Sequence, residues 1–242
     1  MDRASYLSSI RADADLLVAA AGTDLDRPVP TCPGWTCERL LSHVGRVHRW
    51  TAGWVARGEG VEVEKAPPGA AVIGWFRAGV DELVDALEAA DPDATVDTWA
   101  GSQPAIFWPR RMALETVLHR YDAQVAAGTP TPIATPLAVA GIDEMFAVIL
   151  PWRDTSALAG AGETIHLHAT DDDLDRLGGG EWLATLEESG VSVERVHAKG
   201  DLAVRGPASD LLLLLWNRDD ADHLEVFGDR SLLARWRAAV TV

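Results

Sequence analysis

The sequence contains little cysteine and no long apolar run, and each shortage argues against a class of protein. Two cysteines among 242 residues do not make a disulfide framework. No stretch reaches the ~18 apolar residues that a membrane-spanning helix needs. The N-terminal segment alternates charged and apolar residues and has no signal-peptide core. We therefore expect a cytoplasmic protein that binds no membrane.

Positive charge is also scarce. The chain has 21 Lys and Arg residues against 37 Asp and Glu residues, which gives a formal net charge of −16. Such a chain repels phosphate backbones and anionic membrane surfaces, so we expect no nucleic-acid partner. An arginine that lines a cleft would stand out in this acidic field as a carboxylate-binding group.

Aromatic residues make up 7% of the chain, whereas alanine and leucine are frequent, and this composition favours helices. The length suffices for one large or two modest domains. Residues 91–108 are expected to be irregular, with at most one short strand. Helical spacing of apolar residues, with turn residues between the segments, predicts helices over 2–22, 37–57, 69–90, 109–127 and 136–150. We expect Thr36 to cap the second of them, and a helical bundle over residues 1–155.

The pattern changes near Pro151. The segment ETIHLHA, residues 163–169, alternates like a strand, and three further short strands are expected within 181–206. The run ASDLLLLLWNR predicts a short apolar helix, HLEVFG a strand and DRSLLARWRAAV a final helix. Strands followed by packed helices predict a small α+β domain over residues 156–242.

Glu115 and His119 stand four residues apart in the segment 109–127. On a helix this spacing places both side chains on one face, roughly 5–6 Å apart at Cβ, so they can bind one metal ion from the same side. His43 offers a third ligand, and three protein ligands leave one coordination position open. The ligand types suit zinc, with nickel, iron or manganese as alternatives. Spacing alone also allows a simpler interpretation, in which His43 is half-buried and Glu115 and His119 form a surface pair.

The remaining histidines and the cysteines give weaker signals. His48 lies about 140° around its helix from His43, so it should not share the same metal. His166 and His168 share one strand face and could form a second metal pair, but we favour two half-exposed strand residues without a ligand. We assign no catalytic role to Cys32, which belongs to a CPGW loop, or to Cys37.

Three stretches resemble the mycothiol-dependent maleylpyruvate isomerase family of the DinB-like metalloprotein superfamily. They are VPTCPGWTCERLLSHVGRVHRW, RRMALETVLHRYDA, and a C-terminal run from HLHATDDD through GDLAVRGPASDLLLLLWNR to VFGDRSLLARW. The resemblance covers nearly the whole chain. It implies a DinB-like four-helix bundle, residues 1–155, followed by a sterol-carrier-protein-like α/β domain, residues 156–242. The chain departs from the family at Asn217, where glycine commonly precedes arginine.

The resemblance implies a divalent metal, usually zinc, held by His43, Glu115 and His119, and mycothiol as cosubstrate. In the reaction for which the family is named, a thiolate adds to the cis double bond of maleylpyruvate. Rotation and elimination then give the trans product, fumarylpyruvate. Related DinB-like enzymes transfer such thiols to electrophiles, so a mycothiol S-transferase is an alternative, and a non-catalytic metal- or ligand-binding protein is another. The expected partners are a small electrophile and a low-molecular-weight thiol, and the chain would be a monomer or a homodimer.

Two arginines are candidates for binding the substrate's carboxylates. Arg46 follows His43 by three residues on nearly the same helix face, and Arg205 ends a strand of the second domain. Asp122 follows His119 by three residues. It can orient a histidine that binds a metal or pair with an arginine, and we expect a structural pairing.

Overall fold

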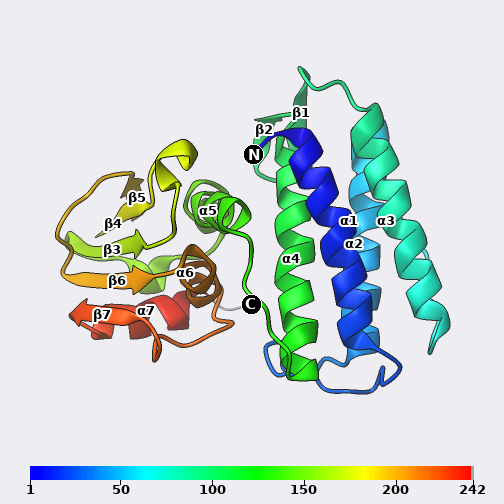
Figure 1. Ribbon diagram of the computed structural model, residues 1–242. Coiled ribbons are helices and arrows are strands. Elements are labelled where there is room, and N and C mark those ends of the chain that lie inside the picture. Colours follow the sequence, from blue (N-terminus) through cyan, green and yellow to red (C-terminus); the bar gives the residue numbers. More distant parts are fainter. Residues whose placement is uncertain (241–242) are drawn as a thin grey trace. The chain divides into compact units, whose positions relative to one another are not determined.

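The computed structural model describes residues 1–240, and the chain divides into two compact units, Met1–Thr131 and Pro132–Val242 (Figure 1). The sequence analysis places the boundary at residue 155 instead. The difference arises from helix α5, Thr135–Glu144, which was assigned to the bundle from its apolar spacing. In the structure this helix packs against helix α6, Ala208–Leu215, within the second unit.

Within the first unit, which the structure describes throughout, four helices form the predicted bundle. They are α1 (Arg3–Ala21), α2 (Cys37–Arg57), α3 (Ala71–Ala89) and α4 (Phe107–Ala127). Helix α1 packs along α4, and α2 packs along α3 (Figure 1). Helices α2 and α4 also meet, which brings the segment around His43 to the segment around Glu115.

The ends of α2 and α4 follow signals in the sequence. Thr36 caps α2 as predicted, because its side-chain oxygen accepts a hydrogen bond from the backbone N–H of Arg39 at 3.3 Å. Gly58 and Gly128 end α2 and α4 in the left-handed backbone region, with φ angles of 77° and 73°. Glycine adopts this conformation without a steric penalty.

Helix α4 is buried around most of its circumference rather than along one stripe. Its buried side chains include charged and polar ones, among them Arg111, His119, Arg120 and Asp122. Such groups need partners inside the protein, and Arg120 for example donates to Asp13 Oδ1 at 3.2 Å. Helix α4 therefore carries ionisable groups into the interior of the bundle.

A β-hairpin precedes α4, where the sequence analysis expects at most one strand. Strands β1 (Thr95–Thr98) and β2 (Gly101–Pro104) pair antiparallel. Each strand has four residues, too few for an alternating pattern to stand out against irregular chain. Two short strands can still form because each supplies the other's hydrogen-bonding partners.

The second unit contains a five-stranded sheet in the order β5-β4-β3-β6-β7. Its strands are β3 (Glu163–Ala169), β4 (Glu181–Glu187), β5 (Gly190–Glu194), β6 (Leu202–Gly206) and β7 (Glu225–Gly228). The central strand β3 pairs antiparallel with β4 and parallel with β6. Helix α7, Ser231–Ala239, ends the described chain. The predicted α+β layout is confirmed.

Successive residues of the sheet point to opposite faces. One face belongs to the core of the unit and carries the buried side chains Ile165, Leu167, Trp182, Ala184, Leu202 and Val204. Helix α6 contacts β3 and β6. The opposite face carries His166 and His168 of β3, with Glu181 of β4 paired to His168 in the strand register.

The helix expected over 136–150 is not regular. Helix α5 ends at Glu144 and continues as a π-helical turn, Met145–Ile149, and a 3₁₀ turn, Leu150–Trp152. The segment Thr135–Trp152 is long and apolar enough to cross a membrane by length and composition, contrary to the sequence analysis. Because 61% of it is buried inside the protein, it is weak evidence for a membrane span and matches a core helix.

Asn217 occupies the position at which the sequence departs from the family pattern. Its φ angle is 54°, in the left-handed region, which asparagine tolerates better than most residues. Its Nδ2 donates to the backbone oxygen of Arg237 at 3.0 Å and also to that of Val240. The loop therefore keeps a glycine-like conformation without glycine.

Candidate metal centre

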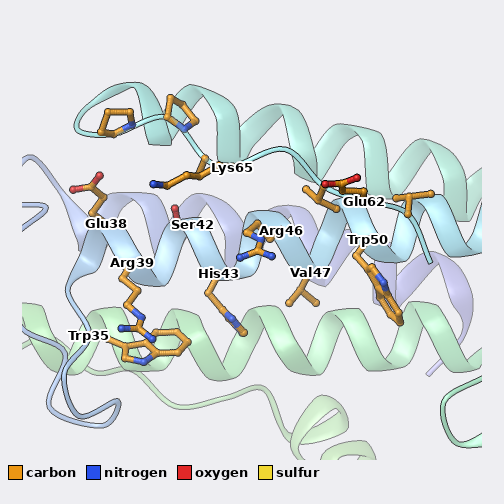
Figure 2. A pocket seen from close by; sticks show the side chains of 15 residues that line it. Trp35, Glu38, Arg39, Ser42, His43, Arg46, Val47, Trp50, Glu62 and Lys65 are labelled. Atoms are coloured by element: carbon orange, nitrogen blue, oxygen red, sulfur yellow. The ribbon is translucent and has the colours of Figure 1, made fainter.

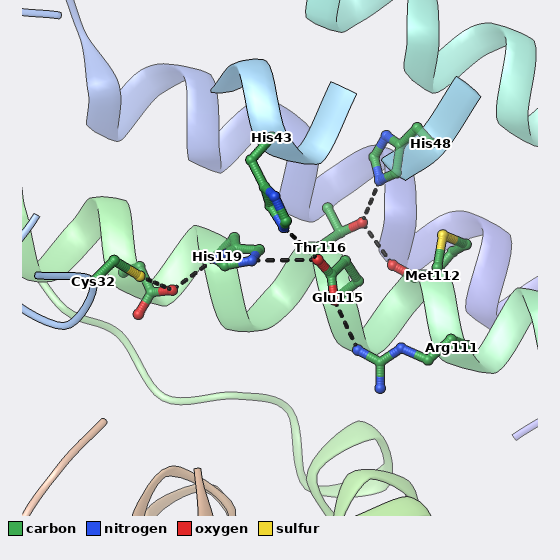
Figure 3. Close-up of polar contacts among 9 residues, drawn as sticks. Cys32, His43, His48, Arg111, Met112, Glu115, Thr116 and His119 are labelled. Carbon is green, nitrogen blue, oxygen red and sulfur yellow. Dashed lines mark hydrogen bonds and ion pairs between the residues drawn. The ribbon is translucent and has the colours of Figure 1, made fainter. Parts of the chain in front are cut away.

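Three side chains meet between α2 and α4. His43 Nε2 lies 3.1 Å from Glu115 Oε1, and His119 Nε2 lies 3.3 Å from the same oxygen (Figure 3). One ligand atom from each of the three residues lies within 4.8 Å of the others. The structure thus brings together the three residues that the sequence analysis selected. Their role as metal ligands stays a prediction.

Local structure explains the convergence. Glu115 and His119 are one helical turn apart on α4, so their side chains stack along one face. His43 projects from α2 beside Leu40, Leu41 and Val44, which are buried in the bundle. Packing of this apolar face fixes the rotation of α2 and points His43 toward α4 (Figures 2 and 3).

A second layer of side chains holds the cluster. Arg111, one turn before Glu115, donates to Glu115 Oε2 at 3.0 Å. His119 Nδ1 lies 2.8 Å from Asp122 Oδ2, which leaves Nε2 directed at Glu115. The sequence analysis favoured a structural pairing for Asp122. In the structure it contacts the histidine, the arrangement that fixes the orientation of metal-binding imidazoles.

The pKa values of the cluster reflect burial and these contacts. Burial raises the pKa of Glu115, but hydrogen bonds from His119 and His43 and nearby positive charges outweigh it, so the pKa lies well below its usual value. Burial lowers the pKa of His119, but its hydrogen bonds, that to Asp122 first among them, hold the pKa well above its usual value. Glu115 is therefore ionised, and His119 favours the protonated form when no metal competes.

Cys32 is close to this site, which sequence reasoning missed. Its thiol is free and buried, and Sγ lies 3.5 Å from Asp122 Oδ2. Asp122 also accepts a hydrogen bond from Thr31 Oγ1 at 2.6 Å. Cys32 and Thr31 precede the Pro-Gly turn of the CPGW loop, and no spacing rule links that loop to a helix ninety positions later. Cys37 is likewise free and buried.

Trp35 of the same loop covers the two histidines. Its ring lies 4.8 Å from the His43 ring and 6.1 Å from the His119 ring, nearly parallel to the latter. The guanidinium of Arg39 lies over the Trp35 ring at 5.0 Å. An aromatic wall of this kind limits access of water to the imidazoles.

A pocket of about 1100 Å³ opens beside the cluster, between α2 and the segment 61–68. Of the three clustered residues, His43 lines it. The pocket is also lined by the positive side chains of Arg39, Arg46 and Lys65 and by the negative ones of Glu38 and Glu62, so positive charges outnumber negative ones there in a strongly acidic chain (Figure 2). Arg46, a predicted site residue, thus lines the same pocket as His43.

The other candidates lie elsewhere. Arg205 is on β6 in the second unit and forms an ion pair with Glu225 of β7, so its part in catalysis stays a prediction. His48 is fully buried, contacts Thr116 Oγ1 at 2.9 Å and is not part of the cluster, as expected from its helical angle. Because Thr116 donates its own proton to Met112 O, His48 Nε2 carries the proton of a neutral ring.

These features define a class of protein: a four-helix bundle with an internal His–Glu–His cluster, followed by an α+β unit with a five-stranded sheet. Residues 7–124 match the model of the mycothiol maleylpyruvate isomerase N-terminal domain, and residues 136–235 match that of the MDMPI C-terminal domain. The chain therefore belongs to the mycothiol maleylpyruvate isomerase family, and the resemblance noted in the sequence is confirmed.

Solved structures agree at the level of fold. The crystal structure of the mycothiol-dependent maleylpyruvate isomerase is similar with a TM-score of 0.58 and 16% identity, and covers 93% of each chain. A histidine-to-alanine mutant of that enzyme gives a TM-score of 0.59 and 15% identity over the same shares. A comparison with curated proteins finds no match.

Proposed function

We propose that the protein is a mycothiol-dependent metalloenzyme that isomerises a small, doubly charged electrophile of the maleylpyruvate type from cis to trans. The observation that carries the proposal is the cluster of His43, Glu115 and His119, whose His43 member lines a pocket with positive side chains. Membership of the family supports the thiol cosubstrate.

The donor set fits a zinc ion. Two imidazoles and one carboxylate are common ligands of catalytic zinc, and Arg111 and Asp122 orient them in the way such sites require. A bound zinc ion would offer an open position at which a thiol loses its proton and becomes nucleophilic. The chain's own residues supply the anionic ligand and the fixed ring orientations.

The pocket beside the cluster offers room for both reactants and a cationic group for a substrate carboxylate. Its volume of about 1100 Å³ is at the upper end of small-molecule sites, so a thiol cosubstrate and a small dicarboxylate fit together. Arg46 binds one carboxylate in this proposal, because guanidinium and carboxylate match as a bidentate pair. Trp35 shields the reacting atoms from water.

A mycothiol S-transferase needs the same activated thiol and differs only in the fate of the electrophile. Isomerisation returns the thiol at the end of each turnover, whereas transfer consumes it in an adduct. The large pocket suits both reactions, and the family favours isomerisation.

The test begins with elemental analysis of the purified protein, for which we expect a divalent metal that His43→Ala removes. Turnover is then measured with mycothiol and a panel of maleylpyruvate, haloalkyl and epoxide electrophiles. Isomerised product with unchanged thiol supports the proposal. Stoichiometric adduct with the electrophiles identifies a transferase, and absence of both reactions in metal-loaded protein rejects an enzymatic function of this type. Glu188→Gln, a change at an exposed position outside the candidate clusters, serves as the control.

A further inference from the structure

Three histidines of the second unit converge on one carboxylate. Glu181 Oε2 lies 2.9 Å from His166 Nε2, 3.5 Å from His168 Nδ1 and 2.7 Å from His197 Nδ1. The three imidazole rings are 6.0, 6.1 and 6.3 Å apart and nearly perpendicular to one another. Each ring therefore has one nitrogen within 3.5 Å of the same glutamate oxygen.

The sheet and one loop build this arrangement. His166 and His168 point to the same face of β3, and Glu181 is the cross-strand partner of His168 on β4. His197 comes from the segment 195–200, which follows β5 and returns to the sheet. Gly200 permits the approach, because a Cβ at this position would lie 2.9 Å from the backbone nitrogen of His166.

One of the three histidines, His166, is buried, so the cluster is not merely a group of solvated surface side chains. His166 is 5% exposed although it lies on the face opposite the core. Its Nε2 has no hydrogen-bond partner, because the nearby Glu181 oxygen does not have hydrogen-bond geometry toward it. A buried ring nitrogen without a partner is costly, and this one lies 2.9 Å from the Glu181 oxygen that the other two histidines also approach.

Hydrogen bonding alone leaves this group unsatisfied. A carboxylate oxygen has two lone pairs, and here three imidazoles approach a single oxygen. Protonating all three rings would place like charges about 6 Å apart. A single divalent cation removes both difficulties, since neutral imidazole nitrogens and a carboxylate oxygen can all donate to it.

We propose that His166, His168, Glu181 and His197 form a second metal site, which binds a divalent transition metal of the zinc class. One ligand atom each from His168, Glu181 and His197 already lies within 4.8 Å of the others. His166 lies outside that group, but its Nε2 is 2.9 Å from Glu181 Oε2 and would join as the fourth ligand. Four protein ligands make a closed, structural site. Its role is to fasten the segment 195–200 to the sheet, and it is independent of the proposed catalysis.

The stoichiometry of zinc tests this site. The full chain, freed of any affinity tag, is dialysed against Zn²⁺ and analysed for bound metal. We expect two equivalents in the wild type, one in His43→Ala, one in His168→Ala and none in the double variant. Glu188→Gln, a change at an exposed position outside the candidate clusters, is the control and keeps two.

The two proposals fail separately. If His43→Ala retains the wild-type zinc content while His168→Ala loses one equivalent, the bundle site is rejected and the sheet site stands. If His168→Ala and His197→Ala both keep the wild-type content, the sheet site is overturned. His197 is 81% exposed, so its replacement should leave the fold intact.

Trypsin gives a second measurement in the same proteins. Lys199 lies in the segment that the metal would fasten, so zinc should slow cleavage after Lys199 in the wild type and in His43→Ala. It should not slow this cleavage in His197→Ala. Equal protection by zinc in His197→Ala and wild type contradicts the proposal.

Discussion

The histidine–carboxylate cluster of the bundle and that of the sheet are built on different secondary structure. In the bundle, Glu115 and His119 share a helix face, and buried partners orient both. In the sheet, His168 of β3 and Glu181 of β4 are direct cross-strand partners, and His197 lies in the segment 195–200 that follows β5. The bundle cluster adjoins a pocket of about 1100 Å³, whereas in the sheet cluster ligand-type atoms of His168, Glu181 and His197 lie within 4.8 Å of one another. Under our two proposals, the bundle cluster is a catalytic metal site and the sheet cluster is a structural one.

The largest expected effect follows from removing the carboxylate of the bundle cluster. Glu115→Gln keeps the shape of the side chain but removes its charge, so metal affinity and thiol activation are both lost. Since metal catalysis contributes several kcal/mol, we expect kcat/KM for isomerisation to fall by at least ~10³-fold. Steady-state kinetics with mycothiol measure the loss. Glu188→Gln, at an exposed position, should match the wild type, and a Glu115→Gln enzyme of normal activity would contradict the metal site.

His48 is a buried histidine of the bundle outside the cluster, and replacing it tests whether burial keeps its ring neutral. Burial lowers its pKa to about 3, while an unfolded histidine has a pKa of about 6.5. As the pH falls below 6.5 the unfolded state gains a proton and the folded state does not. His48 therefore costs about 1.4 kcal/mol of stability for each pH unit between 6.5 and 3.

The measurement is urea unfolding at pH 7 and pH 5 for wild type and His48→Gln. The variant should be less stable at pH 7, because the buried ring and its bond to Thr116 are lost. Its stability should nevertheless fall less steeply between the two pH values. Equal slopes would show that His48 is not held neutral.

Asp122 marks a difference between the two clusters, because in the bundle its carboxylate contacts His119 and orients the ring. Asp122→Asn removes the charge that fixes the His119 ring, and loss of such a partner typically costs 10–100-fold in metal affinity or activity. We expect this loss in zinc affinity, measured by competition with a chelator. Asp85→Asn, at an exposed position of α3, is the control. The sheet site should keep its zinc in Asp122→Asn.

Replacing Arg46 tests whether the pocket beside the bundle cluster binds the substrate's carboxylate. Arg46→Gln should raise KM for the dicarboxylate by at least about 10-fold, since a hydrogen bond to a charged group contributes roughly 1.5–3 kcal/mol. It should leave the zinc content unchanged. Arg57→Gln, an exposed change at the end of the same helix, controls for net charge. An unchanged KM would remove Arg46 from the substrate site.

The comparison also shows which parts of the site a sequence can predict. Helical spacing pairs Glu115 with His119 directly, and the family resemblance adds His43. The pattern of period two likewise placed His166 and His168 on one face. It could not show that Glu181 and His197 meet them, because strand register and loop path depend on tertiary packing.

Two further features of the first unit could not be predicted from local sequence: the contact of Cys32 with the site and the hairpin before α4. Contacts across ninety residues, such as that of Cys32 with Asp122, have no local signal. The helices themselves were predictable because apolar periodicity, caps and terminal glycines agree within each segment. The division between the units was not, since an apolar helix such as α5 does not reveal which core it joins.

The smallest effect concerns the approach of the segment 195–200 to the sheet. In Gly200→Ala the new Cβ would lie 2.5 Å from Leu202 O and 2.9 Å from His166 N, so the backbone must shift. Overpacking of this kind costs at least about 1 kcal/mol, and the shift moves His197 away from Glu181. Gly74→Ala meets nothing within 4 Å, and in a helix it should stabilise the bundle by about 1 kcal/mol. Thermal unfolding measures both changes. Zinc analysis should show one lost equivalent in Gly200→Ala and none in Gly74→Ala, and full zinc content in Gly200→Ala would mean that the sheet cluster does not depend on this segment.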